Sequence, residues 1–298
     1  MNPPYLQHGD GIAFAAPARK VTAKELNIAI NLIEKKGYSV RVPAHLLGEN
    51  SQFSGTDKER TADFQQLLDD PNIKAIFCVR GGYGSVRVID KLDFTSFCKH
   101  PKWICGYSDI TVFHAHIHQH YQMPTLHCAM PTEFKELHSL SVTTLFEALV
   151  GKKSLYTTSP HPQNRLGTAE GVVIGGNLSV LYSLLGSSSE PDCTHKILFL
   201  EDVDEYLYHI DRMMIALKRA GKLQDIAGLI VGGLSKMHDN EIPFGKNATE
   251  IIYEHCAYYS FPMLFNFPAG HIVDHCALKL GVKSAINVTV DGGSFVEL

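Results

Sequence analysis

Residues 103–111 read Trp-Ile-Cys-Gly-Tyr-Ser-Asp-Ile-Thr, an apolar strand that passes through a turn into a helix. The turn leaves Ser108 and Asp109 at the start of that helix. This order of elements is typical of a nucleophile elbow, in which a tight turn lifts a serine hydroxyl out of a parallel sheet. The elbow pattern normally has a second glycine two residues after the serine, where this chain has Ile110. Serine is also a favoured helix cap, so these residues alone leave a structural role open.

On both sides of this stretch, strand and helix signals alternate through the first half of the chain. The predicted strands are apolar runs at residues 12–16, 38–42, 73–79 and 102–106. The predicted helices begin at capping boxes headed by Thr22 and Thr56, and further helices cover 109–120 and 131–150. Gly37 follows the first helix, where a terminating glycine is expected. Repeated strand–helix units predict an α/β fold with a parallel sheet and helices on both faces.

The composition changes at residues 151–167, which are rich in polar residues and show little periodicity. We interpret this segment as a linker between a first domain at 1–150 and a second domain at 168–298. The second domain also alternates. Its predicted strands are at 197–201 and 226–231, its helices at 177–185, 210–220 and 247–259, and a terminal hairpin at 286–297.

Composition and charge exclude several classes of protein. Hydrophobic residues make up 45% of the 298 residues, which is enough for a substantial core. The formal net charge of −4 provides no basic excess for a nucleic-acid partner. The first ten residues lack the regions of a signal peptide, and no apolar run approaches the ~20 residues of a membrane helix. We expect a cytoplasmic protein with no membrane partner, in which seven scattered cysteines stay reduced.

A glycine-rich turn follows the strand at 73–79, where residues 80–85 read Arg-Gly-Gly-Tyr-Gly-Ser. Glycines let the backbone approach a ligand and expose N–H groups. Three interpretations remain open: a phosphate cradle without the spacing of the known motifs, an oxyanion donor at Gly82 N–H beside Ser108, or a plain tight turn. Arg80 ends the strand, where its guanidinium suits a carboxylate ligand or a structural ion pair.

A carboxylate and a histidine complete the set of groups that a serine hydrolase needs. Glu201 closes the apolar strand at 197–201, and His271 follows a Pro-Ala-Gly turn. A triad requires a nucleophile, a base within hydrogen-bond reach and an acid that orients the base. The sequence supplies one candidate for each role. A solvated strand end at Glu201 and an ordinary loop histidine at His271 are, however, as common as the catalytic interpretation.

Four alternating histidines form a rival pattern on the predicted helix at 109–120: His114, His116, His118 and His120. On a helix they make two pairs four residues apart, a spacing that can bind zinc. No H-E-x-x-H motif is present. We therefore favour a helix with partly exposed histidines and expect no metal.

Taken together, these segments resemble the LD-carboxypeptidase family, which comprises muramoyltetrapeptide carboxypeptidases and the related microcin C immunity peptidases. The resemblance covers nearly the whole chain. It is carried by residues 11–17, 80–85, 106–111, 170–171, 175–178, 199–203, 210–213 and 270–271. The order and spacing of so many segments is more specific than any one motif.

The resemblance implies a role for each candidate residue. Ser108 is the nucleophile, Glu201 and His271 complete the triad, and the N–H groups of Gly82 and Asp109 are the oxyanion donors. From the same loop we assign substrate contacts to Arg80, Gly81 and Tyr83.

The resemblance also implies a fold and an activity. Family members have an N-terminal flavodoxin-like domain and a smaller C-terminal α/β domain, are often homodimers, and use no metal or organic cofactor. Their typical reaction removes the terminal D-Ala from a murein tetrapeptide by cutting an L,D-peptide bond, a step of peptidoglycan recycling. We expect this chain to be such a serine carboxypeptidase.

Departures from the family pattern keep two alternatives in view. The runs at 126–130 and 272–281 differ from those usual in the family, which leaves the pocket and the leaving group open. The immunity peptidases hold a nucleotide with aromatic residues after the triad glutamate, and no tryptophan follows Glu201 here, since Trp103 is the only one. The alternatives are an immunity-type peptidase that cleaves a peptidyl- or aminoacyl-nucleotide, and a non-enzymatic module that binds a phosphate ligand.

Overall fold

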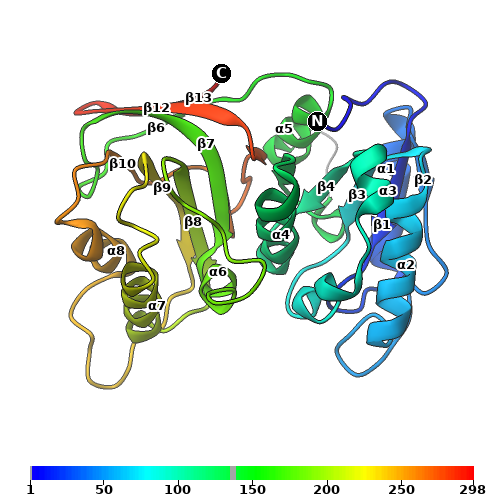
Figure 1. Ribbon diagram of the computed structural model, residues 1–298, viewed down its shortest axis with the longest axis horizontal. Helices are drawn as coiled ribbons and strands as arrows, with labels where there is room; N and C mark the ends of the chain where they lie inside the picture. The colour runs from blue at the N-terminus through cyan, green and yellow to red at the C-terminus, as the bar shows by residue number, and fades with distance from the viewer. Residues whose placement is uncertain (1, 135–138) are drawn as a thin grey trace. The chain divides into compact units, whose positions relative to one another are not determined.

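The computed structural model describes residues 2–134 and 139–298, and the chain forms two compact units (Figure 1). The first unit joins Met1–Lys152 with Cys276–Lys279, and the second joins Lys153–His275 with Leu280–Leu298. A short segment from late in the chain therefore belongs with the first unit. The predicted boundary at 1–150 did not include it.

The first unit is built on a sheet in the order β2–β1–β3–β4–β5, with β11 beside β5. Its strands are β1 (Gly11–Ala15), β2 (Ser39–Arg41), β3 (Ile73–Cys78), β4 (Trp103–Gly106), β5 (Thr125–His127) and β11 (Leu278–Leu280). β1 to β5 are paired in parallel throughout. This is the strand order of flavodoxin-like sheets, in which ligands bind at the carboxyl ends of the strands.

Local capping signals set the helices of this unit. They are α1 (Ala23–Lys35), α2 (Asp57–Asp69), α3 (Thr95–Lys99), α4 (Thr111–Tyr121) and α5 (Leu140–Leu149), with short 3₁₀ turns η1 (Ser85–Arg87), η2 (Ile89–Lys91), η3 (Ser108–Ile110) and η4 (Pro131–Glu133). The capping boxes headed by Thr22 and Thr56 both form, as predicted. Gly37 has a φ of +88° just beyond α1, which confirms its place as the terminating glycine.

Helices cover both faces of the first sheet. One core joins α1 and α5 to side chains of β1, β3 and β4, and in it the rings of Phe77 and Phe146 lie 6.2 Å apart. On α2 and α4, which contact β1 and β4, the rings of Phe64 and Phe113 stack at 4.5 Å. The α/β architecture with helices on both faces of a parallel sheet is therefore confirmed.

The second unit has a mixed sheet in the order β10–β9–β8–β7–β12–β13–β6. Its strands are β6 (Leu155–Thr158), β7 (Gly167–Asn177), β8 (Ile197–Val203), β9 (Gly228–Ser235), β10 (Met263–Leu264), β12 (Lys283–Thr289) and β13 (Gly292–Glu297). β7 to β10 run parallel, whereas β12, β13 and β6 add antiparallel pairs. The helices α6 (Leu178–Ser183), α7 (Leu207–Arg219) and α8 (Ala248–Cys256) enclose a second core.

Three details of the predicted elements can be compared directly with the structure. The terminal hairpin forms, with Thr289 opposite Gly292. The segment at 151–167 is not only a linker, because it contains β6, which pairs with β13 in spite of its polar composition. The helix predicted at 131–150 is too long: Ser139 accepts a hydrogen bond from Val142 N and starts α5 there. Residues 135–138 of that prediction lie outside the described residues.

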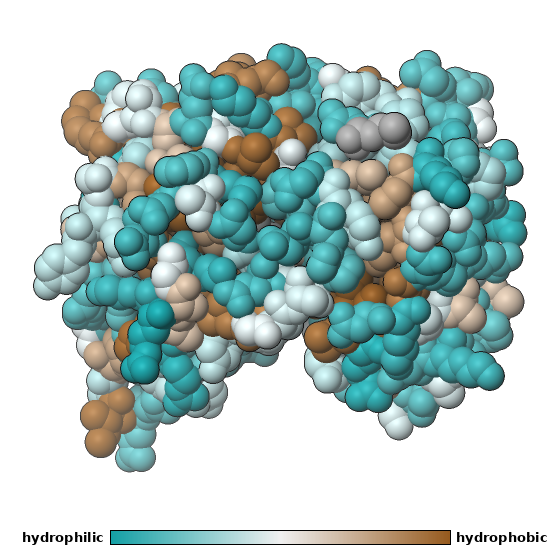
Figure 2. Space-filling view, viewed as in Figure 1, coloured by the Kyte–Doolittle hydropathy of each residue, from teal (hydrophilic) through white to brown (hydrophobic). Residues whose placement is uncertain are grey.

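On the face shown in Figure 2, hydrophilic side chains cover most of the surface of each unit, and apolar side chains appear in small groups between them. In the described residues, none of the helices has both the length and the apolar character needed to cross a membrane.

Candidate active site

Ser108 lies where β4 turns into η3, and its backbone has a φ of +62°. This left-handed conformation is costly for a serine, because its Cβ crowds the backbone. A Cβ at Gly106, two residues earlier, would stand only 2.9 Å from Cγ1 of Ile110. The turn thus requires a glycine and holds the serine in the strained form typical of a nucleophile elbow. Ser108 caps neither η3 nor α4, so the capping alternative is wrong.

The glycine-rich loop after β3 lies directly against this serine. A Cβ added at Gly81 would stand 3.0 Å from Cβ of Ser108 and 3.1 Å from its Oγ. The next glycines, Gly82 and Gly84, have φ values of +105° and +150°, which side chains rarely adopt. The path of this loop over the serine is therefore open only to glycine.

Asp109 ties the loop to the serine turn. Its carboxylate is buried and accepts a hydrogen bond from Ser85 N at 2.8 Å. Burial raises the pKa of this carboxyl group, and the hydrogen bonds from Ser85 lower it. Neither the N–H of Asp109 nor that of Gly82 donates a hydrogen bond to any residue that the structure describes. Both groups can therefore donate to a ligand at the serine.

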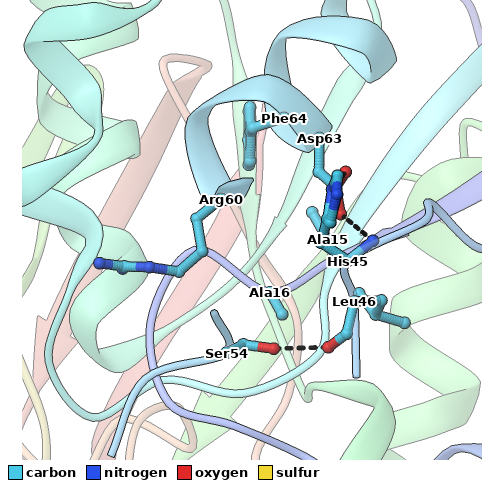
Figure 3. A pocket seen from close by; sticks show the side chains of 8 residues that line it. All are labelled: Ala15, Ala16, His45, Leu46, Ser54, Arg60, Asp63 and Phe64. Atoms are coloured by element: carbon cyan, nitrogen blue, oxygen red, sulfur yellow. Dashed lines mark hydrogen bonds and ion pairs between the residues drawn. The ribbon is translucent and has the colours of Figure 1, made fainter. Parts of the chain in front are cut away.

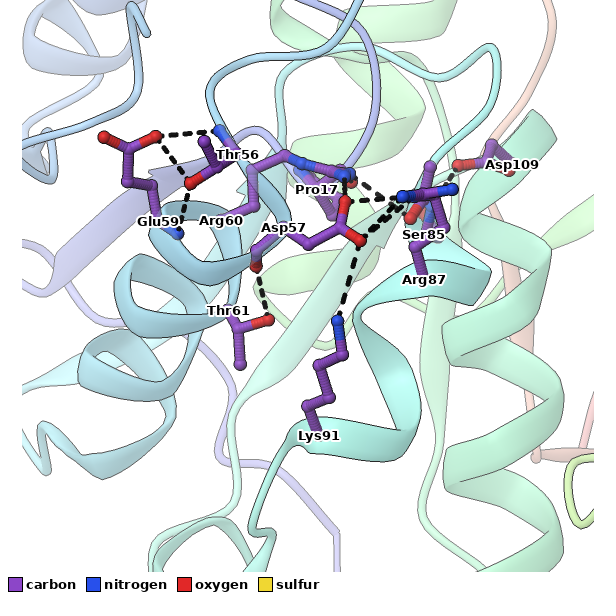
Figure 4. A network of polar contacts seen from close by, with 11 residues as sticks. Pro17, Thr56, Asp57, Glu59, Arg60, Thr61, Ser85, Arg87, Lys91 and Asp109 are labelled. Atoms are coloured by element: carbon purple, nitrogen blue, oxygen red, sulfur yellow. Dashed lines mark hydrogen bonds and ion pairs between the residues drawn. The ribbon is translucent and has the colours of Figure 1, made fainter. Parts of the chain in front are cut away.

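Arg60 on α2 anchors the far end of the glycine-rich loop (Figure 4). Its buried guanidinium donates hydrogen bonds to the carbonyl oxygens of Pro17 and Gly84. It also pairs with Asp57, whose carboxylate binds the Arg87 guanidinium at 2.9 Å. The first turn of α2 therefore holds both the loop after β1 and the loop after β3. The sequence offered no signal for this role, because an arginine in a helical turn is expected to be exposed.

In the second unit, Glu201 and His271 form a hydrogen-bonded pair. Oε2 of Glu201 accepts a hydrogen bond from Nδ1 of His271 at 2.7 Å and from the His271 backbone N–H at 3.2 Å. The glutamate side chain is fully buried, and the imidazole is 17% exposed. The bond to Glu201 favours the tautomer with its proton on Nδ1, which leaves Nε2 as the nitrogen that can accept a proton.

Glycines and one serine hold the His271 loop on the sheet. A Cβ at Gly270 would stand 2.7 Å from Cβ of Glu201, and Gly270 has a φ of +104°. Gly233 N donates to Ala269 O at 2.9 Å, and Ser235 Oγ donates to His271 O at 2.6 Å. The bonds to the carbonyl oxygens of Ala269 and His271 therefore hold the backbone of this loop, and Glu201 orients the imidazole itself.

A second buried carboxylate follows Glu201. The pairing of β8 with β9 shifts register between Leu200 and Asp202, and both acidic side chains are buried there. Asp202 accepts hydrogen bonds from Asn177 Nδ2 and Ser179 N, both at 2.9 Å. Burial, and after it the charge of Glu201, raises the pKa of Asp202 to about 7. Asp202 therefore holds the corner between β7 and α6, whereas Glu201 holds the histidine.

Two of the predicted substrate residues have partners within the first unit. Nη1 of Arg80 lies 3.3 Å from Oε1 of Glu25, so the ion pair that the sequence left open is formed. Tyr83 is 46% exposed, and its ring lies 6.1 Å from that of Phe53.

Two aromatic residues near the predicted triad glutamate escaped the sequence analysis, which considered only tryptophan. Tyr206 and Tyr208 follow β8 and are 44% and 39% exposed. Their ring centroids lie 5.6 Å apart, and the centroid of the His238 ring lies 5.4 Å from that of Tyr206. The sequence did contain a signal for these residues, namely two tyrosines two positions apart shortly after the predicted strand that ends in Glu201.

The histidines of α4 are mostly buried, so the prediction of partly exposed histidines is wrong for three of the four. His114 is 2% exposed, and its Nε2 lies 2.9 Å from Gly106 O, while His116 and His118 are also buried. Burial lowers the pKa of His114 and of His116 to about 4. Within residues 2–134 and 139–298, no group of three or more His, Cys, Asp or Glu side chains is arranged to hold a metal ion.

A small cavity lies at the carboxyl end of β1 (Figure 3). Its volume is about 10 Å³, which suits one water molecule rather than a substrate. Beside it, His45 Nδ1 lies 2.7 Å from Asp63 Oδ1, and Ser54 Oγ donates to Leu46 O. These bonds fasten the segment that follows β2 to α2, which favours a structural role for this cavity.

Comparisons with known proteins place both units in one family. The model of the LD-carboxypeptidase N-terminal domain matches residues 12–128, and that of the LD-carboxypeptidase C-terminal domain matches residues 170–286.

Individual relatives extend over almost the whole chain. A probable murein peptide carboxypeptidase of Bacillus subtilis is 34% identical over 290 residues, which is 96% of this chain and 91% of the relative. The microcin C7 self-immunity protein MccF of Escherichia coli is 28% identical over 317 residues, covering 94% of this chain and 91% of MccF. The crystal structure of muramoyltetrapeptide carboxypeptidase from Oxalobacter formigenes superimposes with a TM-score of 0.88 at 25% identity, covering 96% of this chain and 98% of that one.

Proposed function

Because this chain belongs to the LD-carboxypeptidase family, we propose that it hydrolyses the L,D-peptide bond of a murein tetrapeptide and releases the terminal D-Ala. The observation that supports the proposal best is the hydrogen-bonded pair of buried Glu201 and partly exposed His271, which leaves Nε2 as a base. The strained turn at Ser108 supplies a serine hydroxyl, a nucleophile that a histidine base can activate. The relatives named for murein peptides support the substrate class.

The proposed mechanism takes its nucleophile from the first unit and its base from the second. His271 Nε2 accepts the proton of Ser108 Oγ as the oxygen attacks the carbonyl of the L,D-bond. Glu201 orients the imidazole and stabilises its charged form. The N–H groups of Gly82 and Asp109 stabilise the oxyanion, a contribution for which each donor typically supplies a factor of ~10²–10³ in rate. The imidazolium then protonates the D-Ala nitrogen, which leaves, and water hydrolyses the acyl-serine ester with His271 again as the base.

Further parts of the proposal concern the substrate and the setting. We keep Gly81 and Tyr83 as proposed substrate contacts, whereas the guanidinium of Arg80 is already paired with Glu25. The reaction belongs to peptidoglycan recycling in the cytoplasm, carried out by a homodimer without a metal or organic cofactor. Sedimentation of the purified protein tests the homodimer.

A second candidate function is cleavage of an aminoacyl- or peptidyl-nucleotide. The identity to MccF extends over 94% of this chain, and Tyr206 and Tyr208 offer exposed rings on which a base can stack. These tyrosines weaken the argument from the absence of tryptophan. Hydrolysis of an aminoacyl-nucleotide in preference to the tetrapeptide would favour this candidate.

The deciding experiment compares wild-type protein with Ser108→Ala on a defined murein tetrapeptide. We expect wild type to release D-Ala and Ser108→Ala to lose essentially all turnover while melting at the same temperature. Ser39→Ala, an exposed serine of the same unit, should retain full activity and serves as the matched control. Release of D-Ala by Ser108→Ala at the wild-type rate would remove the proposed mechanism.

A further inference from the structure

The side chain of Arg19 lies across Gly82, one of the proposed oxyanion donors. A Cβ added at Gly82 would stand 2.5 Å from Cδ of Arg19, 2.6 Å from Nε and 2.8 Å from Cγ. The arginine therefore occupies the space that any side chain at residue 82 would need. The guanidinium of Arg19 therefore lies against the glycine-rich loop that covers Ser108.

Hydrogen bonds hold the backbone on both sides of Arg19, so its side chain extends from a well-anchored segment. Arg19 pairs with Phe53 in an antiparallel bridge. Next to it, Lys20 N donates to Gln52 O at 3.0 Å, and Ser54 N donates to Ala18 O at 3.1 Å. A cation on a fixed backbone loses less freedom when it binds a ligand than one on a mobile loop.

Arg19 differs from the other arginines around this loop in having no acidic partner. Arg80 is paired with Glu25, and both Arg60 and Arg87 are paired with Asp57 (Figure 4). In the part of the chain that the structure describes, Arg19 makes no ion pair and its side chain makes no hydrogen bond.

The charge of Arg19 also reaches the serine turn. Burial raises the pKa of Asp109, and Arg19 is among the positive charges that lower it again. Asp109 itself is engaged with Ser85 N and is not an ion-pair partner for the arginine. The guanidinium is thus an exposed cation near the nucleophile whose anionic partner is not supplied by the described residues.

We propose that Arg19 binds the free carboxylate of the residue that the enzyme removes. This assignment rests on the proposed function, because only a carboxypeptidase substrate carries a free carboxylate one residue beyond the scissile carbonyl. One residue spans about 3.8 Å, so that carboxylate must lie close to the oxyanion donors. The guanidinium that crosses Gly82 is placed for this, and its planar fork matches both carboxylate oxygens.

Arg19 therefore replaces Arg80 as the carboxylate ligand in our assignment. To bind a substrate, Arg80 would first have to give up Glu25, which itself also accepts hydrogen bonds from Thr22. Arg19 has no such competing bond among the described residues.

The test measures kcat/KM for two substrates that differ only in the terminal charge: the murein tetrapeptide and its D-alaninamide counterpart. We expect wild type to prefer the free acid. Arg19→Met should lose about 10- to 100-fold in kcat/KM for the acid, the usual value of hydrogen bonds to a charged group, and should change little for the amide. Arg19→Lys should keep part of the preference. Lys20→Met removes the neighbouring cation, which is paired with Glu49, and should leave both substrates unaffected.

Each other outcome decides against the assignment. If Arg19→Met keeps the wild-type preference for the acid, or if Arg80→Met loses that preference while Arg19→Met does not, Arg19 is not the carboxylate ligand. If wild-type protein releases neither D-Ala nor D-alaninamide, the proposed function fails and this assignment fails with it. Unchanged melting temperatures of the variants, which alter an exposed side chain, separate these results from misfolding.

Discussion

A methyl group at Gly270 would stand 2.7 Å from Cβ of Glu201 and 2.8 Å from its Oε2, so the glutamate side chain already fills the space that it would need. The absence of a side chain there lets the next residue, His271, bring both its backbone N–H and its Nδ1 to one carboxylate oxygen. Gly81 has the same relation to Ser108 in the other unit. At the scale of single residues, the proposed active site depends on glycines that give the reactive side chains room.

Gly270→Ala tests this dependence. The methyl group must displace Glu201 and also adopts an unfavourable φ, so we expect a loss of about 1–3 kcal/mol in the free energy of unfolding. We also expect at least a 100-fold fall in kcat, because the pair that orients the base is disturbed. Urea denaturation and D-Ala release measure the two effects.

The matched control is Gly221→Ala, which has a φ of +73° but no atom within 4 Å of the added methyl group. It should show the backbone cost alone and retain activity. Equal activities of the two variants would contradict the view that the close packing of Glu201 on Gly270 positions His271.

At the scale of elements, the first turn of α2 organises the loops that surround the serine. Arg60 joins the carbonyl oxygens of Pro17 and Gly84, and Asp57 joins Arg60 to Arg87 of η1. The capping box of α2 holds the same turn from the other side. A helix that the sequence presents as an ordinary amphipathic element is therefore also the support of the glycine-rich loop.

Arg60→Met keeps the volume of the side chain and removes its donors. The carbonyl oxygens of Pro17 and Gly84 then lose a buried partner, for which we expect a cost of about 1–3 kcal/mol in unfolding free energy. The loop should also loosen, so kcat should fall more than KM rises. Lys58→Met, an exposed cation on the same turn, should change neither quantity. A wild-type kcat in Arg60→Met would show that the loop holds its shape without this support.

At the scale of the whole molecule, buried titratable groups in both units make the stability depend on pH. His114 and His116 of the first unit have pKa values lowered by burial from 6.5 to about 4. In the second unit, His275 has a pKa lowered by burial to about 4, whereas the pKa of Asp202 is raised to about 7. A group whose pKa is lowered in the folded state makes the protein more stable as the pH rises, and a group whose pKa is raised does the opposite. Asp202 therefore opposes the effect of His275 and of His161, whose pKa is also lowered by burial.

We therefore expect His114 and His116 to destabilise the first unit as the pH falls from 6.5 towards 4, because the unfolded chain binds protons in this range that the buried imidazoles of the folded unit do not bind. The raised pKa values of Asp109 and His45 work the other way, but the His45–Asp63 ion pair has an exposed imidazole and is screened by solvent. Fluorescence of Trp103, the only tryptophan, reports unfolding of this unit at pH 5 and pH 7.5. A variant with glutamine at both histidines should have a smaller difference between the two values, and equal stability of wild type at both would refute the expectation.

Much of the fold was predictable because its signals are local. The capping boxes at Thr22 and Thr56 join residues three apart in the chain, and apolar runs such as 73–79 mark strands wherever they occur. Strands that form because they pair with segments distant in the chain were not predicted. β6 has a polar sequence and is held by its pairing with β13, and β11 completes the first sheet from residues 278–280.

Local sequence signals specify the strand–helix alternation, the turns that require glycine, and the residue types that lie at the ends of strands. Which of these residues meet depends on how the chain packs: His271 bonds Glu201 across 70 positions of the chain, Arg80 pairs with Glu25, and the Arg19 side chain crosses Gly82. The physical reason is the range of the forces involved. Backbone hydrogen bonds and caps act between near neighbours, whereas the partner of a side chain depends on how distant segments pack.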